Sequence, residues 1–440
     1  MSVSLSMISM VGFLNYFEII LILSLLVPSL MVHTYKTSSY LEDMLFCVND
    51  INMMLNFMTV SLVLLIMLST GLMMDKYYFF LQVALGVLLL LCFSSSNLLL
   101  FYILFESSLL PILLMIISWG YQPERLQAGL YMILYTVFGS MPLLVMVLYI
   151  YWFVGNLSFY WLGVFLTLMP SVFYLSFLAF LVKLPVYSMH VWLPKAHVEA
   201  PLGGSMILAG ALLKLGGYGM YMFNLLLISS NMEILTIGII SLSMWGGLFA
   251  SVVCLVQSDI KSMIAYSSIV HMSLVVMGVL SNTTWGQASA LITMIAHGWV
   301  SSALFLIAYI TYLGVGSRSF SYTKGVLSVF PILSLMWFIL TMINMSVPPT
   351  INLVGELIAV PVSMWLNKYL LMVLLLIMFM SVTYNMFLYT KVNHSSFNKY
   401  ILGGKGVSVA GILSVFGHFM PLIMILSMDL TCLCTVTLYK

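Results

Sequence analysis

Residues 97–117, NLLLFYILFESSLLPILLMII, decide the fold class of this chain. The stretch is apolar over about 20 residues, the length that a helix needs to cross the hydrocarbon core of a bilayer. Its one charged residue, Glu106, lies about ten residues into the run, or roughly 15 Å along a helix. We therefore expect a membrane-spanning helix with a carboxyl group near the middle of the bilayer.

The whole chain continues this apolar character. Of its 440 residues, 63% are hydrophobic and only 6% are charged, whereas soluble domains carry about 25% charged residues. A water-soluble fold could not hide so much apolar surface, so lipid is the solvent for most of the length. The net charge is only +2 and the sequence has no run of Lys or Arg, which excludes nucleic acid as a partner.

Apolar runs long enough to span a bilayer recur along the sequence, and the loops between them are short. They predict an all-α polytopic membrane protein with about thirteen to fifteen helices and no separate soluble domain. The runs lie at 17–33, 51–73, 77–96, 97–119, 129–154, 158–192, 204–229, 234–256, 260–281, 287–313, 325–344, 351–367, 369–390 and 406–436, and a weaker one precedes residue 15.

Prolines interrupt the helical pattern in two places. The two regions are 171–194, with Pro185 and Pro194, and 325–367, with Pro348 and Pro349. Proline removes a backbone donor and clashes with the preceding turn, so each region should hold a broken helix. Broken helices at corresponding places in two halves of a chain are typical of inverted-repeat transporters, which bind their ions there. A pair of ordinary proline kinks is the alternative.

Three further charged residues are isolated in the same way as Glu106. Each is the only Asp, Glu, Lys or Arg in a long stretch: Lys183 in 126–194, Lys214 in 200–232 and Glu356 in 325–367. Such a residue costs on the order of 2.5–3.5 kcal/mol at the centre of a membrane helix. Burial disfavours the charged form, and an opposite charge nearby restores it, so carboxylates and lysines in series are typical of proton relays. Ion pairs that hold helices together are the alternative.

Histidines extend this row of ionisable residues. His271 lies one helical turn after Ser267, and His297 lies one turn before Ser301. Each imidazole is therefore expected to share a helix face with a hydroxyl group. A neutral imidazole can pass protons in either direction, and a satisfied core histidine is the alternative.

Three other residues are weaker candidates. Asp259 and Lys261 open the predicted helix at 260–281, where an interfacial and a functional role are both open. His190 is a further candidate for the relay. His190 and His197 do not predict a metal site, because a proline between them breaks any common helical face.

The five cysteines form no disulfide or metal framework. Only Cys432 and Cys434 lie close together, in an apolar run where small core residues are expected. Since no iron–sulfur or haem ligand set is visible, any redox chemistry is expected on a partner. The N-terminus has neither the basic region of a signal peptide nor an Arg-rich transit pattern, which fits synthesis beside the destination membrane in an organelle.

Five segments together carry a resemblance to a known family. They are FYILFESSLLP at 101–111, FLVKLPVYSMHVWLPKAHVEAPLGGSMILAGALLKLGGYG at 180–219, SDIKSMIAYSSIVHMS at 258–273, MIAHGWVSSALF at 294–305 and PPTINLVGEL at 348–357. The chain resembles the antiporter-like, proton-translocating subunits of mitochondrial NADH:ubiquinone oxidoreductase (respiratory complex I) from about residue 50 to 395. Glu356 favours the chain 4 family among them, because the related subunits carry Lys at the matching position.

The resemblance implies about 14 transmembrane helices with two inverted five-helix repeats. The expected parts are N-terminal helices at 1–75, a proton-translocation core at 76–395 with repeats at roughly 76–230 and 231–395, and a C-terminal loop and helix at 396–440. The resemblance also implies a role for each residue of the row. The matches are Glu106 and Lys183 as a paired carboxylate and lysine, Lys214 as a bridging lysine, His271 and His297 on the central axis, and Glu356 as the exit-side carboxylate.

By this resemblance, the chain serves an enzyme that couples NADH-to-ubiquinone electron transfer to proton translocation. The chain itself is expected to bind no metal or cofactor, since NADH, FMN, iron–sulfur clusters and ubiquinone belong to the whole complex. Expected partners are other membrane-arm subunits, especially the antiporter-like chains 2 and 5, and lipids such as cardiolipin, in the mitochondrial inner membrane. A stand-alone multisubunit cation/proton antiporter and a purely scaffolding membrane subunit are the alternatives.

Overall fold

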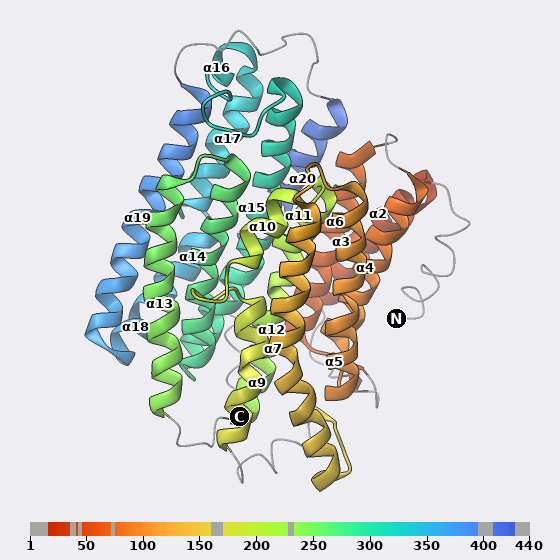
Figure 1. Ribbon diagram of the computed structural model, residues 1–440, viewed down its shortest axis with the longest axis vertical. Coiled ribbons are helices and arrows are strands. Elements are labelled where there is room, and N and C mark those ends of the chain that lie inside the picture. The colour runs from red at the N-terminus through yellow and green to blue at the C-terminus, as the bar shows by residue number, and fades with distance from the viewer. Residues whose placement is uncertain are drawn as a thin grey trace.

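The computed structural model describes residues 16–35, 41–42, 46–71, 75–159, 170–227, 233–394 and 408–426 as a bundle of helices (Figure 1). The weak run before residue 15 and the Cys432–Cys434 pair lie outside these residues. The helices are α2 (Tyr16–Tyr35), α3 (Asp50–Thr70), α4 (Lys76–Ser94), α5 (Leu98–Ser107), α6 (Leu109–Trp119), α7 (Arg125–Val154), α9 (Pro170–Lys183), α10 (Trp192–Glu199), α11 (Leu202–Ile207), η3 (Leu208–Leu212), α12 (Leu213–Leu227), α13 (Glu233–Val256), α14 (Ile260–Leu280), α15 (Thr284–Val315), α16 (Val326–Val329), α17 (Pro331–Asn344), α18 (Ile351–Leu366), α19 (Lys368–Asn393) and α20 (Val409–Leu426).

The all-α membrane fold predicted from the sequence is confirmed. In the described part of the chain, nine helical spans are long and apolar enough to cross a membrane, and three shorter apolar helices accompany them. The count of 14 stays a prediction. Two-residue strands β1 (Leu41–Glu42) and β2 (Cys47–Val48) form one small antiparallel pair.

Burial separates inner helices from outer ones. Nearly every side chain of the spans Leu202–Leu225, Ile260–Leu280 and Thr284–Val315 is enclosed by protein. The outer helices instead turn large apolar side chains outward, as Phe138 and Trp152 of α7 do, which is the pattern of a lipid-facing surface. The polar residues of α12, α14 and α15 are therefore in the protein interior.

Both predicted helix breaks are present. The helix α9 ends at Lys183 and α10 begins at Trp192, while α17 ends at Asn344 and α18 begins at Ile351. In Figure 1, α9 and α10 follow each other from the bottom of the bundle upward, whereas α17 and α18 follow each other from the top downward. The two broken helices therefore run in opposite directions.

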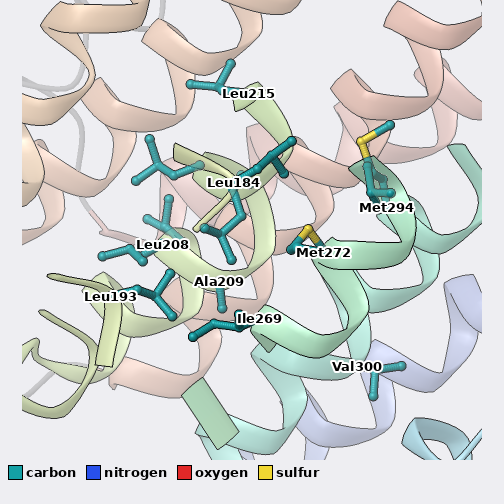
Figure 2. Packing of buried hydrophobic residues seen from close by; sticks show 14 of the residues in the cluster. Leu184, Leu193, Leu208, Ala209, Leu215, Ile269, Met272, Met294 and Val300 are labelled. Atoms are coloured by element: carbon teal, nitrogen blue, oxygen red, sulfur yellow. The ribbon is translucent and has the colours of Figure 1, made fainter. Parts of the chain in front are cut away.

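The predicted span 204–229 is not one regular helix. A π-helical turn, η3, separates α11 from α12 and ends two residues before Lys214. Short π-helical turns occur frequently at functional sites. Figure 2 shows apolar side chains joining the surrounding helices, among them Leu208 of η3, Ile269 of α14 and Met294 of α15.

Candidate functional site

Four of the predicted site residues form a continuous buried chain across three helix contacts. The Nζ atom of Lys214 lies 3.0 Å from Nδ1 of His297. The rings of His297 and His271 have their centroids 5.3 Å apart, and Nδ1 of His271 lies 3.8 Å from Oε1 of Glu356. All four side chains are buried, with residue exposures of 4% or less. We call Lys214, His297, His271 and Glu356 the central row.

Two glycines allow the helices of the central row to approach closely. A Cβ atom added at Gly298 in α15 would lie 3.1 Å from the Gly210 carbonyl oxygen in η3 and 3.5 Å from Cε of Lys214. At Gly210, an added Cβ would lie 2.5 Å from Cδ1 of Leu62. Main chain therefore meets main chain where α15 crosses η3, and this brings Lys214 within reach of His297. The Lys214 ammonium also donates to the Ala209 carbonyl of η3 at 2.6 Å.

We expect Gly298→Val to destabilise the protein by about 1–3 kcal/mol, the usual cost of overpacking a filled interior. The new side chain would clash with Sδ of Met58 and press on the Gly210 carbonyl of η3, next to Lys214. The matched control is Gly238→Val in α13, where an added Cβ meets nothing within 4 Å. Abundance in the membrane and thermal stability measure the effect, and equal behaviour of the two variants would contradict the close crossing.

Glu106 and Lys183 lie beside each other at the other end of the predicted row. Lys183 closes α9, and its ammonium group donates to the Phe105 carbonyl at 2.8 Å while lying 2.9 Å from the centroid of the Phe105 ring. Glu106, half-buried in α5, interacts electrostatically with Lys183 and lies near Ser140 of α7, whose hydroxyl donates to the Val137 carbonyl at 3.1 Å. The two charged groups are neighbours, but the ammonium contacts the carbonyl one residue before Glu106 and makes no direct ion pair with the carboxylate.

Lys183 also adjoins the helix that carries Lys214. A Cβ atom added at Gly216 of α12 would lie 3.2 Å from Cβ of Lys183. The Glu106–Lys183 pair therefore packs within one helical turn of the central row.

The serine hydroxyls one helical turn from the two histidines bond to main-chain carbonyls of their own helices. The Ser301 hydroxyl donates to the His297 main-chain carbonyl at 2.7 Å, and the Ser267 hydroxyl donates to the Ile264 carbonyl at 2.7 Å. Serines inside helices commonly bond to a carbonyl one turn earlier. The imidazoles instead have ionisable partners on other helices.

The three weaker candidates lie apart from the central row. Lys261 is buried and donates to the Ala200 carbonyl at 3.1 Å. Asp259 occupies the N-cap position of α14 without a side-chain cap bond, half-buried. His190 lies between α9 and α10, where its ring stacks on Tyr187 at 4.8 Å. In the described residues, no group of three or more His, Cys, Asp or Glu side chains is placed to hold a metal ion.

Comparison with known proteins gives the family. A family model described as NADH:quinone oxidoreductase/Mrp antiporter, transmembrane, matches residues 95–382, which is more than half of the chain. The chain belongs to this antiporter-like family. Within the family, the NADH-ubiquinone oxidoreductase chain 4 of Albinaria caerulea is 47% identical over 324 residues, covering 73% of this chain and 74% of the relative. This antiporter-like chain is therefore a member of the chain 4 group, as its sequence motifs predicted.

Solved structures show the same fold. A chain of respiratory complex I from Thermus thermophilus with bound NADH superposes with a TM-score of 0.88 at 21% identity, covering 99% of this chain and 97% of that one. A chain of the Mrp complex from Dietzia sp. DQ12-45-1b gives a TM-score of 0.82 at 16% identity, covering 96% of this chain and 49% of that one. At these identities the likeness concerns the antiporter-like fold alone.

Proposed function

We propose that this chain is a proton-translocating membrane-arm subunit of NADH:ubiquinone oxidoreductase. The observation that carries the proposal is the central row, in which four titratable side chains from four helical segments follow one another inside the membrane-spanning bundle. Membership of the chain 4 group supports this function over a stand-alone cation/proton antiporter.

The geometry of the central row suits stepwise proton movement. The 3.0 Å contact between Lys214 and His297 is within direct proton-transfer distance. The 3.8 Å contact between His271 and Glu356 needs only a small side-chain rotation or one bridging water. Each group can hold a proton or release it, and a change at one group alters the electrostatic energy of the next.

Glu106 and Lys183 fit the role of a switch next to the central row. A proton on Glu106 removes a negative charge beside Lys183, which makes a charged Lys183 less favourable in a low-dielectric interior. Because Lys183 packs against α12, the change acts on the helix that holds Lys214. Glu106 and Lys183 therefore control how many protons the central row holds. The contacts described for His190 and Asp259 do not give them this role.

Two repeats at roughly 76–230 and 231–395 fit the structure. The helices α9 and α17 have equal lengths, and both ends of α17 lie 161 residues beyond those of α9 (170 to 331 and 183 to 344). The isolated bridges Asn97–Ser158 and Asp259–Ser319 occupy corresponding places in the two halves. The thiols of Cys92 and Cys254 donate to carbonyls nine residues later in the same manner, at 3.9 Å each. Residues 1–75 and 396–440 lie outside this scheme.

The electron chemistry belongs to other subunits, which hold FMN and the iron–sulfur clusters and react with NADH and ubiquinone. We place this chain between the antiporter-like chains 2 and 5 in the mitochondrial inner membrane, with lipids such as cardiolipin on its outer helices. Purification from native membranes tests this assembly. Co-migration with flavin and iron–sulfur subunits is expected, and migration without them would overturn it.

We expect Glu106→Gln to lower the number of protons translocated per NADH oxidised, because glutamine cannot bind or release a proton at the switch. Glu106→Asp, which keeps a carboxyl group, is the matched control and should retain more of the activity. Proton uptake and NADH oxidation are measured together in proteoliposomes that contain the whole complex. A normal proton number with Glu106→Gln would show that Glu106 has no part in translocation.

A further inference from the structure

A polar cavity of about 500 Å³ lies at one end of the bundle. Its lining includes five charged side chains, from the loop before α7, the C-terminal turn of α10, the start of α14 and the segment after α15: Glu124, Glu199, Asp259, Lys261 and Arg318. Its volume is large compared with the roughly 30 Å³ that a water molecule occupies in the liquid. We call this space the charged cavity.

The inner wall of the charged cavity is held by an ion pair and two carbonyl contacts. Arg318 lies 3.7 Å from the Glu199 carboxylate and donates to the Val198 carbonyl at 2.7 Å. Lys261, with 4% exposure, donates to the carbonyl of Ala200, two residues after Val198. These three contacts all fix the C-terminal end of α10, the helix that carries His197.

His197 is fully buried behind this wall and has an unusual environment. Its ring stacks face to face on Phe305 of α15, with centroids 4.7 Å apart and planes 3° apart. Neither ring nitrogen has a hydrogen-bond partner among the residues that the structure describes, although an unsatisfied buried polar group costs about 1–3 kcal/mol. Another buried histidine, His418, places Nδ1 2.7 Å from the Ser414 carbonyl. The stacking on Phe305 fixes the ring plane of His197, while both ring nitrogens are without a partner among the described residues.

His197 lies between the charged cavity and the central row. Lys261 on the cavity side and Lys214 on the row side are both close enough to interact with its ring electrostatically. His297 interacts with it as well. Phe305, on which the ring stacks, is eight residues after His297 in the same helix, or roughly 12 Å. Water molecules are the groups that can satisfy both nitrogens and span this separation.

We propose that His197 is a further proton-relay residue, which connects the charged cavity to Lys214 and His297 through water. This inference rests on the proposed function of the chain. A water on the cavity side gives a proton to one ring nitrogen, and the other nitrogen releases its proton to a water on the Lys214 side. The same steps in reverse carry a proton outward. After each transfer the ring holds its original number of protons, and the N–H returns to its original nitrogen before the next transfer.

The test replaces His197 in the whole complex and counts protons translocated per NADH oxidised. His197→Phe keeps a planar ring against Phe305 but cannot carry a proton. We expect it to lower the proton number by about as much as Lys214→Met does, with the complex still assembled. The control is His418→Phe, which removes an equally buried imidazole far along the chain and should leave the proton number normal.

The outcomes separate this inference from the proposed function. A normal proton number with His197→Phe and a lowered one with Lys214→Met would overturn the role of His197 alone. Normal numbers with both variants would overturn the function itself. An equal fall in the proton number with His197→Phe and with His418→Phe would show that these imidazoles affect translocation only through packing. If His197→Phe fails to assemble, the same count with His197→Gln decides, because glutamine keeps a polar side chain but cannot relay a proton.

Discussion

Lys214→Met is expected to stop proton transfer through this subunit while leaving the complex assembled. Methionine is unbranched and fills the space of the lysine chain, so the apolar contacts around position 214 survive. The variant removes the ammonium group that donates to the η3 backbone and contacts His297. A positioned proton-transfer group contributes about 10²–10⁴-fold to the rate of its step, so transfer past position 214 should fall by at least about 10²-fold.

The stability of this variant should change little, because two effects oppose each other. Loss of the ammonium leaves the Ala209 carbonyl and Nδ1 of His297 without their partner, at about 1–3 kcal/mol for a buried group. Removal of a fully buried cation at the same time ends its desolvation cost, which is several kcal/mol. Normal abundance with lost pumping is therefore the expected combination.

Lys214→Arg separates charge from proton exchange. Arginine keeps the positive charge but does not deprotonate in proteins, so it should not restore pumping. Protons per NADH and the rate of ubiquinone reduction are measured in proteoliposomes for both variants. Full pumping by Lys214→Arg would mean that a fixed positive charge is sufficient and that Lys214 does not exchange a proton.

The broad architecture could be predicted from the sequence because its causes are local. Apolar runs of spanning length follow from the cost of exposing polar backbone to lipid. The breaks next to Pro185 and Pro348 follow from the missing amide hydrogen and the steric clash of proline, and both are present. Isolation of a charge in an apolar run is also a local pattern, and it identified Lys214 and Glu356, which the structure places in one buried row.

The contacts within the site could not be predicted in the same way, because they depend on how distant helices cross. Lys214 meets His297, 83 residues away, only because Gly210 and Gly298 let two backbones touch. Helix spacing alone placed Ser301 one turn after His297, but it could not show that the hydroxyl bonds to the His297 main-chain carbonyl. The sequence raised His197 only as a metal ligand, which it did not support. No sequence pattern predicts an imidazole that stacks on Phe305 and has no hydrogen-bond partner among the described residues.

The close packing of the row explains how the chain tolerates such costly residues. Lys214 and His297 share a contact, His271 and Glu356 share another, and the two histidine rings join them. Lys214 thus has the neutral His297 imidazole as a hydrogen-bond partner, and Glu356 has an oppositely charged neighbour when His271 is protonated, so each contact compensates part of the burial cost. The same contacts would also exist if the residues only held helices together, so energetic coupling and pumping must be measured on the same variants.

A double-mutant cycle on His271 and Glu356 makes that distinction, and its largest expected effect is on stability. His271→Leu leaves the Glu356 carboxyl group buried without the imidazole 3.8 Å away, which is its ion-pair partner when protonated. Breaking a buried pair on one side costs on the order of 3–5 kcal/mol, whereas replacing both partners by apolar residues is often neutral. The double variant with leucine at both positions should therefore be more stable than either single variant.

Proton translocation should not recover in the double variant, although stability does. All three variants remove a member of the central row, so each should lose proton translocation, including the stable double variant. Thermal inactivation and native-gel abundance of the complex report stability, and proteoliposomes report protons per NADH. The neutral pair Asn224–Asn282, with a 2.7 Å hydrogen bond, gives the energetic reference, with coupling of about 0.5–1.5 kcal/mol. A double variant that is stable and pumps normally would mean that His271 and Glu356 serve as an ion pair between α14 and α18 and carry no protons.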